Sequence, residues 1–391
     1  RINQSFESLR ENISSVMEYD YYGGLLGGAL FAFVLLPFLG LTYTPVLIGS
    51  LNLLVASLIL WYFPDRLMRP RILNIQFAAL FLVSVLAFVV AKPIVLYGEQ
   101  HKYKDKIVYQ EQTRYQKIVV TQWKEDYWLF INGSTQFSTY DEERYHEPLV
   151  HPLMGLIKER KDILLLGGGD GLAAREILKY PDVENLTLVD LDPAMTRLAR
   201  QDTIFLSINQ GSLNDPRVRV VNQDAYQFIK NSGDLYDAVI IDLPDPKSVS
   251  LSLLYSLGFY KMVEKHLKPF GSMVTQSTSP LYSPEAFLCI KKTMEAAGFS
   301  TVPYQNSVPS MGQWGWVIGV RHEAMPAQRL KQELLTLEFA DIETRFFNRD
   351  AMISMAHFGK GLFEKEAQIE PNTQFDHNIL KYYRQGNWDV Y

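Results

Sequence analysis

The sequence predicts an α/β protein with a doubly wound sheet, preceded by a small β domain and by transmembrane helices. Three patterns predict this architecture. Residues 23–63 and 72–91 carry no charge, residues 98–140 contain short alternating strands, and from residue 162 onward apolar runs end in glycine or aspartate. An apolar strand followed by a glycine-rich turn and a helix is typical of doubly wound sheets.

Composition limits the possible partners. The chain has 391 residues, enough for two or three structural units, and a net charge of -5. No nucleic-acid partner is expected, because phosphate backbones are bound by basic surfaces. The single cysteine, Cys289, excludes an internal disulfide, and the sequence has no Cys/His cluster that would predict a metal site. Because the chain begins with Arg1 rather than Met, we expect a segment upstream of it.

Residues 1–97 are predicted to form a transmembrane region. The stretch 23–63 is long enough to cross a bilayer twice with a turn at 40–45, and 72–91 is long enough to cross once. Buried core helices of a soluble protein are the alternative, but such helices normally carry a polar stripe. We therefore expect three spans and the lipid bilayer as a partner.

Residues 98–140 are predicted to form a small β domain. Alternating residues indicate strands at 115–123, 127–131 and 135–138, and Asn132-Gly133 is a strong signal for a tight hairpin. An amphipathic helix then begins at Asp141 and leads to the large domain.

The stretch 162–171 is the centre of the predicted sheet. Residues 163–166 are apolar enough for a buried strand, and Gly167 and Gly169 leave a turn in which backbone N–H groups can approach a nucleotide-like ligand. A helix is predicted after this turn. Asp170 would repel a phosphate or carboxylate and would hold a cationic group. A loop cap is the alternative role for Asp170.

Three further predicted strands each end in acidic residues. Asp190 ends the first, at the distance from the glycines where an acid commonly binds ribose hydroxyls. Asp224 and Ala225 follow the second strand, and Asp242 and Asp245 follow the third. A solvated acid is the alternative for Asp190, and a turn-stabilising side chain is the alternative for Asp224. The three strands are 186–190, 218–221 and 238–241.

Several short motifs also occur in a characteristic order and spacing. They are Tyr115-Gln116-Lys117-Ile118, Asn132-Gly133, Asp141-Glu142-Glu143-Arg144-Tyr145-His146-Glu147, Gly167-Gly168-Gly169-Asp170-Gly171, Val189-Asp190-Leu191-Asp192, Asn214-Asp215-Pro216-Arg217-Val218, Asp224-Ala225, Tyr236-Asp237-Ala238-Val239-Ile240-Ile241-Asp242 and Asp245-Pro246. Over roughly residues 100 to 320 this order resembles the spermidine synthases, which are polyamine aminopropyltransferases. The hydrophobic amino-terminal part resembles the membrane-embedded bacterial branch of that family.

The resemblance implies a reaction and a set of roles. In that family an aminopropyl group passes from decarboxylated S-adenosylmethionine to a polyamine amine, usually that of putrescine, and 5′-methylthioadenosine is released. No permanently bound cofactor and no metal are implied. Asp242 is implied as the proton acceptor, with Asp245 beside it. The residues implied to bind the nucleoside donor are Gln116, Gly167, Gly169, Asp170, Asp190, Asp224 and Ala225. The residues implied to bind the polyamine are Tyr145, His146, Asp170, Asp245 and Trp314.

The residues themselves agree with this chemistry. In an ordinary methyltransferase an acid two residues before the first glycine holds the methionine amine, whereas here Leu165 stands at that position.

A primary amine with a pKa of about 10.4 arrives as an ammonium and must lose a proton before it attacks. Two close carboxylates repel one another, which raises the pKa of one of them. Asp242 and Asp245 are therefore the predicted catalytic pair.

Some positions keep two interpretations. Residues 246–258 are predicted as a flexible cover, although 252–260 could equally be core. His146 could be an ordinary surface histidine, and Trp314 with Trp316 could pack in the core rather than line a polyamine groove. Thr278 stands where many relatives have a Glu that meets the far amine of the acceptor, so the identity of the acceptor stays open.

We predict four parts: residues 1–97 in the membrane, the β domain 98–140, a Rossmann-like catalytic domain 141–321, and an extension 322–391 that forms a dimer contact or covers the sheet. We expect a homodimer. Positive charges on the two sides of the spans nearly balance, with Arg66, Arg69 and Arg71 in one loop. The multi-pass protein is predicted in the cell membrane with its catalytic domain in the cytoplasm, because a free cysteine and a nucleoside ligand belong there.

Two other functions compete with the aminopropyl transfer. A membrane-bound S-adenosylmethionine-dependent methyltransferase would use the same fold, and a non-catalytic polyamine sensor or transporter would use the same binding residues. The complete set of acids argues against the second.

Overall fold

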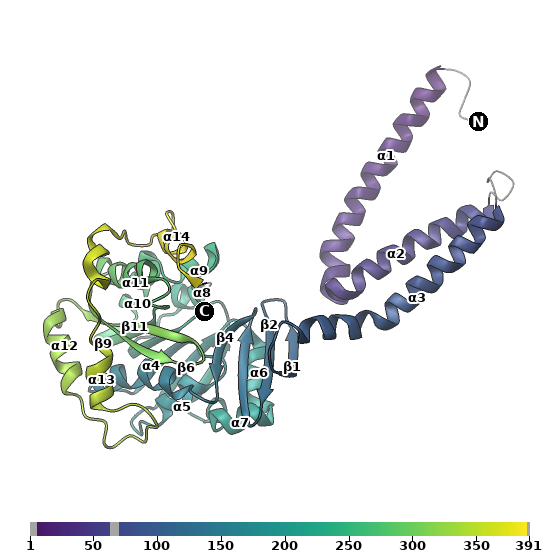
Figure 1. Cartoon of the computed structure of the whole chain (residues 1–391). Helices are drawn as coiled ribbons and strands as arrows, with labels where there is room; N and C mark the ends of the chain where they lie inside the picture. The colour runs from purple at the N-terminus through teal and green to yellow at the C-terminus, as the bar shows by residue number, and fades with distance from the viewer. Residues whose placement is uncertain (1–5, 63–69, 389–391) are drawn as a thin grey trace. The chain divides into compact units, whose positions relative to one another are not determined.

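The computed structural model describes residues 6–62 and 70–388, and the chain divides into two compact units, Arg1–Ile107 and Val108–Tyr391 (Figure 1). Arg66 and Arg69, which enter the charge balance across the predicted spans, lie outside the described residues. The first unit contains α1 (Phe6–Leu30), the π-helical η1 (Phe31–Leu35), α2 (Leu36–Tyr62) and α3 (Pro70–Gln100).

The first unit has three helical stretches that are long and apolar enough to cross a membrane. They are Ile13–Gly40, Thr42–Tyr62 and Arg71–Gln100, so the number of candidate spans equals the predicted three. Gly40 has φ 63° and breaks the helix at the predicted turn, where the Thr44 hydroxyl donates to the Gly40 carbonyl at 2.6 Å. Apolar side chains such as Phe33, 78% exposed, cover this unit, and such a surface suits lipid rather than water.

The second unit begins with a four-stranded antiparallel sheet in the order β1-β2-β3-β4. Asn132 and Gly133 have φ 51° and 82°, both positive as a type I′ hairpin requires, which confirms the predicted turn. Strand β1 was not among the predicted strands; it is half-buried on both faces, so strict alternation does not mark it. The strands are β1 (Lys106–Gln112), β2 (Lys117–Trp123), β3 (Asp126–Ile131) and β4 (Ser134–Ser138).

The large sheet has seven strands in the order β10-β11-β9-β8-β5-β6-β7. Strands β9, β8, β5, β6 and β7 are parallel, whereas β11 and β10 are antiparallel additions, so the doubly wound α/β prediction is confirmed. The strands are β5 (Asp162–Gly167), β6 (Asn185–Asp190), β7 (Val218–Asn222), β8 (Tyr236–Asp242), β9 (Leu267–Gln276), β10 (Phe299–Val308) and β11 (Gly312–Arg321).

Helices cover both faces of this sheet. Ile163 and Leu165 of β5 join one buried cluster with α4, α5, α12 and α13, and Leu164 and Leu166 join another with α8, α10, α11 and α14. This is why β5 is apolar at every position rather than alternating. In Figure 1, α10 and α11 lie on one side of the sheet and α4 and α5 on the other. The remaining elements are α4 (Glu143–Leu156), α5 (Leu172–Leu178), α6 (Pro193–Gln201), α7 (Thr203–Asn209), η3 (Ser212–Asn214), α8 (Ala225–Asn231), α9 (Val249–Leu253), α10 (Leu257–Lys265), α11 (Pro284–Ala296), α12 (Ala327–Thr336), α13 (Arg349–Met355), η4 (Leu362–Gln368) and α14 (Asn378–Arg384).

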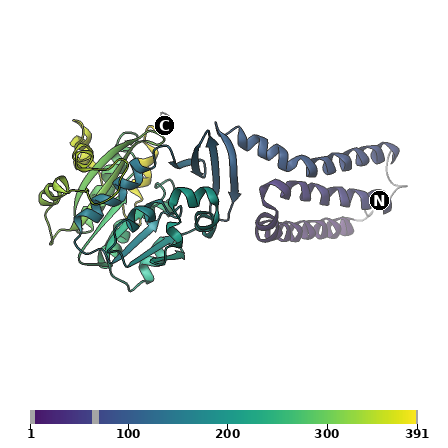
Figure 2. The ribbon, with the colours of Figure 1, turned by 90° about the horizontal axis from the view of Figure 1, so that it is seen from below.

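The small sheet lies beside α6 and α7 (Figure 2). Phe137 of β4 contacts Phe205 of α7 with ring centroids 6.1 Å apart. The Thr113 hydroxyl, in the turn between β1 and β2, donates to Asp192 Oδ2 at 2.8 Å. These contacts fix the small sheet against the edge of the large one on the side where β5 and β6 end.

The carboxyl-terminal segment packs on both faces of the large sheet. Glu147 of α4 accepts the backbone N–H groups of Arg345, Phe346 and Phe347 at 2.7 to 2.9 Å. Farther along, α14 packs against α11 on the opposite face. The carboxyl-terminal segment is therefore hydrogen-bonded to α4, the helix that follows the small sheet.

Candidate active site

The candidate site lies where the strand order reverses. From β5 the chain proceeds to β6 and β7 in one direction, whereas β8 and β9 extend the sheet in the other. Gly167 at the end of β5 is paired in register with Asp242 at the end of β8. Ligands of doubly wound sheets bind at the carboxyl ends of the strands at such a point.

The glycine turn allows backbone and carboxylates to approach closely. A Cβ on Gly167, which has φ 87°, would lie 2.0 Å from the Asp242 carbonyl oxygen, and a Cβ on Gly169 would lie 2.4 Å from Asp190 Oδ2. The Asp170 side chain accepts the N–H of Leu172 at 2.8 Å, so the loop cap anticipated as its alternative role is present. Burial raises the pKa of Asp170.

Gly167→Ala is expected to destabilise the protein by about 3 kcal/mol, because it combines an unfavourable φ with a backbone collision. Gly211→Ala is the matched control: its φ is 68°, but no atom lies within 4 Å of the added Cβ, so only about 1 kcal/mol should be lost. Denaturant unfolding of both variants measures the difference. Equal losses would mean that the approach to Asp242 is unimportant.

Asp190 ends β6 and lies beside the glycine turn. Its carboxylate accepts the N–H groups of Gly169 at 3.1 Å and Asp192 at 2.9 Å. Burial, together with the charges of Asp170 and Asp192, raises the pKa of Asp190 to about 6. Gln116 is linked to this end of the site through Thr113: the Gln116 N–H donates to the Thr113 hydroxyl at 3.0 Å, and that hydroxyl donates to Asp192.

Asp224 and Ala225 lie at the start of α8, beyond β7. Asp224 is exposed, and its side chain accepts the N–H of Gln227 at 2.9 Å as the cap of that helix. Ala225 is buried. The turn-stabilising role anticipated for Asp224 is therefore present, and contact with a nucleobase stays a prediction.

Asp242 lies opposite the glycine turn and next to α4. Its Oδ1 accepts the hydroxyl hydrogen of Tyr145 at 2.6 Å. Burial and the charge of Asp170 raise the pKa of Asp242 to about 6, although His146 and the Tyr145 hydrogen bond act in the opposite direction. A carboxylate with this pKa is ionised at pH 7 and can still accept a proton.

His146 is buried rather than lying on the helix surface. It is 1% exposed, and its Nδ1 lies 3.1 Å from Glu142 Oε2. Burial lowers the pKa of His146, but the hydrogen bond and charge of Glu142, with Asp170 and Asp242, raise it overall. The surface-histidine interpretation is therefore wrong, and the ring is held beside Tyr145 at a centroid distance of 5.0 Å.

Asp245 is held from two directions. Tyr383 of α14 donates its hydroxyl hydrogen to Oδ2 at 2.9 Å, and Gln276 Nε2 lies 3.4 Å from Oδ1. The indole N–H of Trp314 donates to Gln276 Oε1 at 3.2 Å, and its ring lies 6.4 Å from that of Tyr145. Trp314, which is 6% exposed, thus contacts Gln276 and Tyr145, the neighbours of Asp245 and Asp242.

The segment 246–258 is the predicted flexible cover, and its flexibility stays a prediction. It contains α9 and the start of α10, and Ser252 and Tyr255 are fully buried. For these two residues the core interpretation holds. The Tyr255 hydroxyl donates to the carbonyl of Leu243 at 3.0 Å and so supports the loop between the two acids.

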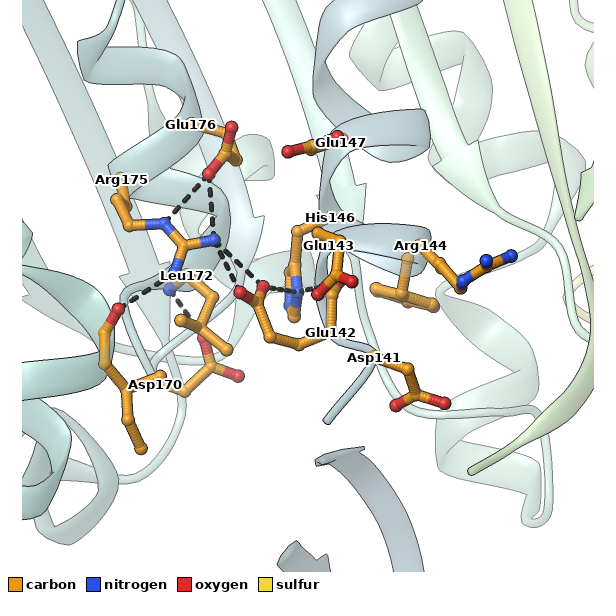
Figure 3. Close-up of polar contacts among 12 residues, drawn as sticks. Asp141, Glu142, Glu143, Arg144, His146, Glu147, Asp170, Leu172, Arg175 and Glu176 are labelled. Carbon is orange, nitrogen blue, oxygen red and sulfur yellow. Dashed lines mark hydrogen bonds and ion pairs between the residues drawn. The ribbon is translucent and has the colours of Figure 1, made fainter. Parts of the chain in front are cut away.

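A buried network of charged side chains joins α5 to the start of α4 (Figure 3). Arg175 of α5 donates to both carboxylate oxygens of Glu142 at 2.9 Å and to Glu176 at 2.8 Å. Glu142 also contacts Arg345 of the carboxyl-terminal segment. Because Glu142 holds His146, this network sets the position of the helix turn that carries Tyr145. Sequence reasoning missed Arg175, Gln276 and Tyr383 as parts of the site, because no local pattern distinguishes them.

Comparison with known proteins identifies the family. The profile of the Spermine/spermidine synthase domain matches residues 142–332. A polyamine aminopropyltransferase of Oceanobacillus iheyensis is 37% identical over 393 residues, which cover 100% of this chain and 75% of the relative. The chain belongs to the polyamine aminopropyltransferase family. Polyamine aminopropyltransferase 2 of Aquifex aeolicus is 39% identical over 98% of this chain and 74% of its own length.

Solved structures agree with the fold of this aminopropyltransferase. The crystal structure of spermidine synthase from Thermotoga maritima has a TM-score of 0.58 at 22% identity and covers 67% of this chain and 88% of its own. A spermidine synthase in complex with the transition state analogue AdoDATO has a TM-score of 0.60 at 22% identity, covering 67% and 89%. The predicted family, fold and transferase class are confirmed, and the competing methyltransferase and sensor hypotheses lose their support.

Proposed function

We propose that this aminopropyltransferase moves the aminopropyl group of decarboxylated S-adenosylmethionine to a primary amine of putrescine or a related polyamine. The product would be 5′-methylthioadenosine. The observation that carries the proposal is the position of Asp242, a half-buried carboxylate with a pKa of about 6, in register with the glycine turn at the reversal of strand order. Asp170, Asp190 and Asp245 add negative charge that suits two cationic substrates.

The donor is proposed to lie along the ends of β5, β6 and β7. Asp190 would accept hydrogen bonds from the ribose hydroxyls, and Asp170 would hold the ammonium of the propylamine arm. Gly167 and Gly169 have no Cβ and would leave room for the nucleoside. Gln116 would contact the donor from the small sheet. Asp224 with Ala225 would meet the adenine.

The acceptor is proposed to lie between α4 and the loop after β8. Tyr145 and Trp314 would form walls of its channel, and Asp245 would hold the charge of its far end. His146 would complete the wall next to Tyr145. Burial lowers the pKa of His146, but the hydrogen bond and charge of Glu142, together with the charges of Asp170 and Asp242, raise it overall.

The reaction would be an in-line displacement with Asp242 as the proton acceptor. The acceptor ammonium loses a proton to Asp242, and the free amine nitrogen attacks the propyl carbon that is bonded to the sulfonium sulfur. A carbon–nitrogen bond forms while the carbon–sulfur bond breaks, and its electron pair stays on the sulfur of the thioether product. The hydrogen bond from Tyr145 would orient Asp242 for this transfer.

The rate should fall at acidic pH, because only ionised Asp242 can accept a proton. With a pKa of about 6, kcat/KM for the acceptor is expected to fall about tenfold per pH unit below that value. Bound cations favour the ionised carboxylate, so the fall in kcat should occur at lower pH. Initial rates at saturating donor test this, because saturation removes the titration of Asp190. A flat profile from pH 7 to 5 would contradict it.

One experiment tests the activity itself. The purified chain is incubated with decarboxylated S-adenosylmethionine and a panel of diamines, and the products are identified by mass. A polyamine longer by one aminopropyl group is expected together with 5′-methylthioadenosine. Calorimetry with the decarboxylated and the intact nucleoside separates the methyltransferase alternative, because tighter binding of the carboxylate-bearing compound would defeat the proposal.

We also propose that the three apolar helices anchor the enzyme in the cell membrane with the catalytic unit in the cytoplasm. The free and buried Cys289 and the nucleoside substrate support this orientation. The homodimer stays a prediction. Protease accessibility in spheroplasts tests the orientation, and sedimentation in detergent tests the oligomeric state.

A further inference from the structure

The carboxyl-terminal segment reaches the acceptor side of the site from far along the chain. Tyr383 of α14, which is 6% exposed, donates its hydroxyl hydrogen to Asp245 Oδ2 at 2.9 Å. The two residues are 138 positions apart in the sequence. Sequence reasoning assigned no chemistry to this segment, yet its tyrosine contacts one of the paired acids directly.

This segment is fixed by bonds that do not involve Asp245. The fully buried Asn372 donates its side-chain amide to the carbonyls of Ser252 at 2.8 Å and Tyr255 at 3.1 Å. The backbone carbonyl of Asn372 accepts the N–H of Leu257 at 2.8 Å. The chain that follows the paired acids is therefore fastened to the carboxyl-terminal segment.

The ring of Tyr383 is also held in place. Trp388 stacks on it with centroids 4.5 Å apart and an interplanar angle of 29°, and the indole N–H donates to the Tyr383 carbonyl at 2.8 Å. The N–H of Asn387 donates to the Tyr282 carbonyl at 2.7 Å, which joins this turn to the segment before α11. The hydroxyl that meets Asp245 is thus preorganised.

A second hydroxyl belongs to the same end of the site. Thr278 is fully buried with φ 57°, a conformation that β-branched residues rarely adopt. Its hydroxyl lies beside the Asp245 carboxyl and acts as a hydrogen-bonding group that favours the ionised form and lowers its pKa. Thr278 therefore belongs, with Tyr383, to the groups that surround the Asp245 carboxylate.

We propose that Tyr383 is a positioning residue for the acceptor. It holds the Asp245 carboxylate in the orientation that receives the far ammonium of the acceptor, and Thr278 lies beside the same carboxylate. The ammonium meets the carboxylate, and Tyr383 acts through it. This inference rests on the proposed function, in which Asp245 binds the acceptor.

The pKa of Asp245 depends on the titratable groups that surround its carboxyl. Titratable groups that face Asp245 are Lys247 of its own loop, Tyr145 of α4, Tyr255 before α10 and Tyr383. Burial raises the pKa of Tyr145 and Tyr255 well above the usual value, so both stay neutral. Burial raises the pKa of Asp245, whereas Lys247 and the Tyr383 hydrogen bond lower it. Loss of the Tyr383 hydroxyl should therefore raise that pKa further.

Tyr383→Phe in the full chain tests the proposal, with Tyr382→Phe as the matched control. Tyr382 lies in the same helix, and its hydroxyl accepts the N–H of Glu370 at 3.2 Å instead of bonding Asp245. In Tyr383→Phe, KM for the acceptor is expected to rise on the order of tenfold, with the acidic limb of its kcat/KM moved to higher pH. KM for the donor and the melting temperature should match those of the control.

The same substitution in an Asp245→Asn background should have no further effect on acceptor KM, because Tyr383 acts through Asp245. If the unaltered chain transfers no aminopropyl group, the proposed function fails. If it does transfer, and Tyr383→Phe keeps both acceptor KM and the pH profile, this inference alone is overturned. A parallel loss in acceptor KM, donor KM and melting temperature would also overturn it, since that would show a purely structural role.

Discussion

Asp242→Asn is expected to lower kcat on the order of a hundredfold or more while donor binding is kept. An amide cannot accept the proton of the acceptor ammonium, but it has nearly the shape of the carboxylate. Its oxygen can still accept the hydrogen bond that Tyr145 donates at 2.6 Å in the unaltered protein. The backbone carbonyl that lies against Gly167 is untouched. The loss should therefore be chemical rather than structural.

Single-turnover rates at saturating donor and acceptor measure this loss, and calorimetry measures donor binding. Asp234→Asn is the matched control, because Asp234 is 64% exposed and pairs only loosely with Arg219 at 3.7 Å. That variant should react at the unaltered rate. A rate for Asp242→Asn within about threefold of its control would remove Asp242 from the mechanism, because general-base loss costs on the order of a hundredfold.

Arg175→Met is expected to destabilise the fold by about 3 kcal/mol or more, because it leaves buried carboxylates without their main partner. Glu142 and Glu176 are 1% and 0% exposed in their side chains. Burial raises the pKa of Glu176, but hydrogen bonds from His151 and Lys179 and the charge of Arg175 lower it to about 2, so loss of Arg175 removes one of the groups that stabilise this buried charge. Met has a similar length and no charge, so the change isolates the ion pairs.

Denaturant unfolding in detergent, followed by tryptophan fluorescence, measures the free energy of unfolding. Arg329→Met is the control: its pair with Glu333 lies one turn apart on an exposed helix face, and such a pair is worth about 0.5 kcal/mol or less. Under conditions in which Arg175→Met stays folded, the variant should also transfer to the acceptor more slowly, because Glu142 positions His146 and the adjacent Tyr145. A loss equal to that of the control would mean that the network contributes nothing.

The parts of the site that sequence patterns predicted are those that follow strands. Gly167, Asp190 and Asp242 each end an apolar run, and parallel strands bring their carboxyl ends to one edge. Asp224 also follows a strand, but its side chain caps α8, which a strand-end pattern alone does not reveal.

The parts that sequence patterns missed depend on distant partners. Strands β10 and β11 contain proline, glycine and polar residues, and they are stable as strands because they pair with each other and β11 pairs with β9. Arg175 looks like any helix arginine until α5 packs on α4 and brings it to Glu142. Propensity and periodicity describe neighbours in the chain, so they hold no information about such pairs.

By itself, the sequence determined the three long apolar segments, the glycine turn, the order of acidic strand ends and the family, because each depends on residue types at short, regular spacing. Only the tertiary structure decided that His146 is a buried partner of Glu142 and that a tyrosine of the carboxyl-terminal segment bonds Asp245. The physical reason is that burial and hydrogen bonding between segments far apart in the chain arise from packing of the whole unit, which no local pattern encodes.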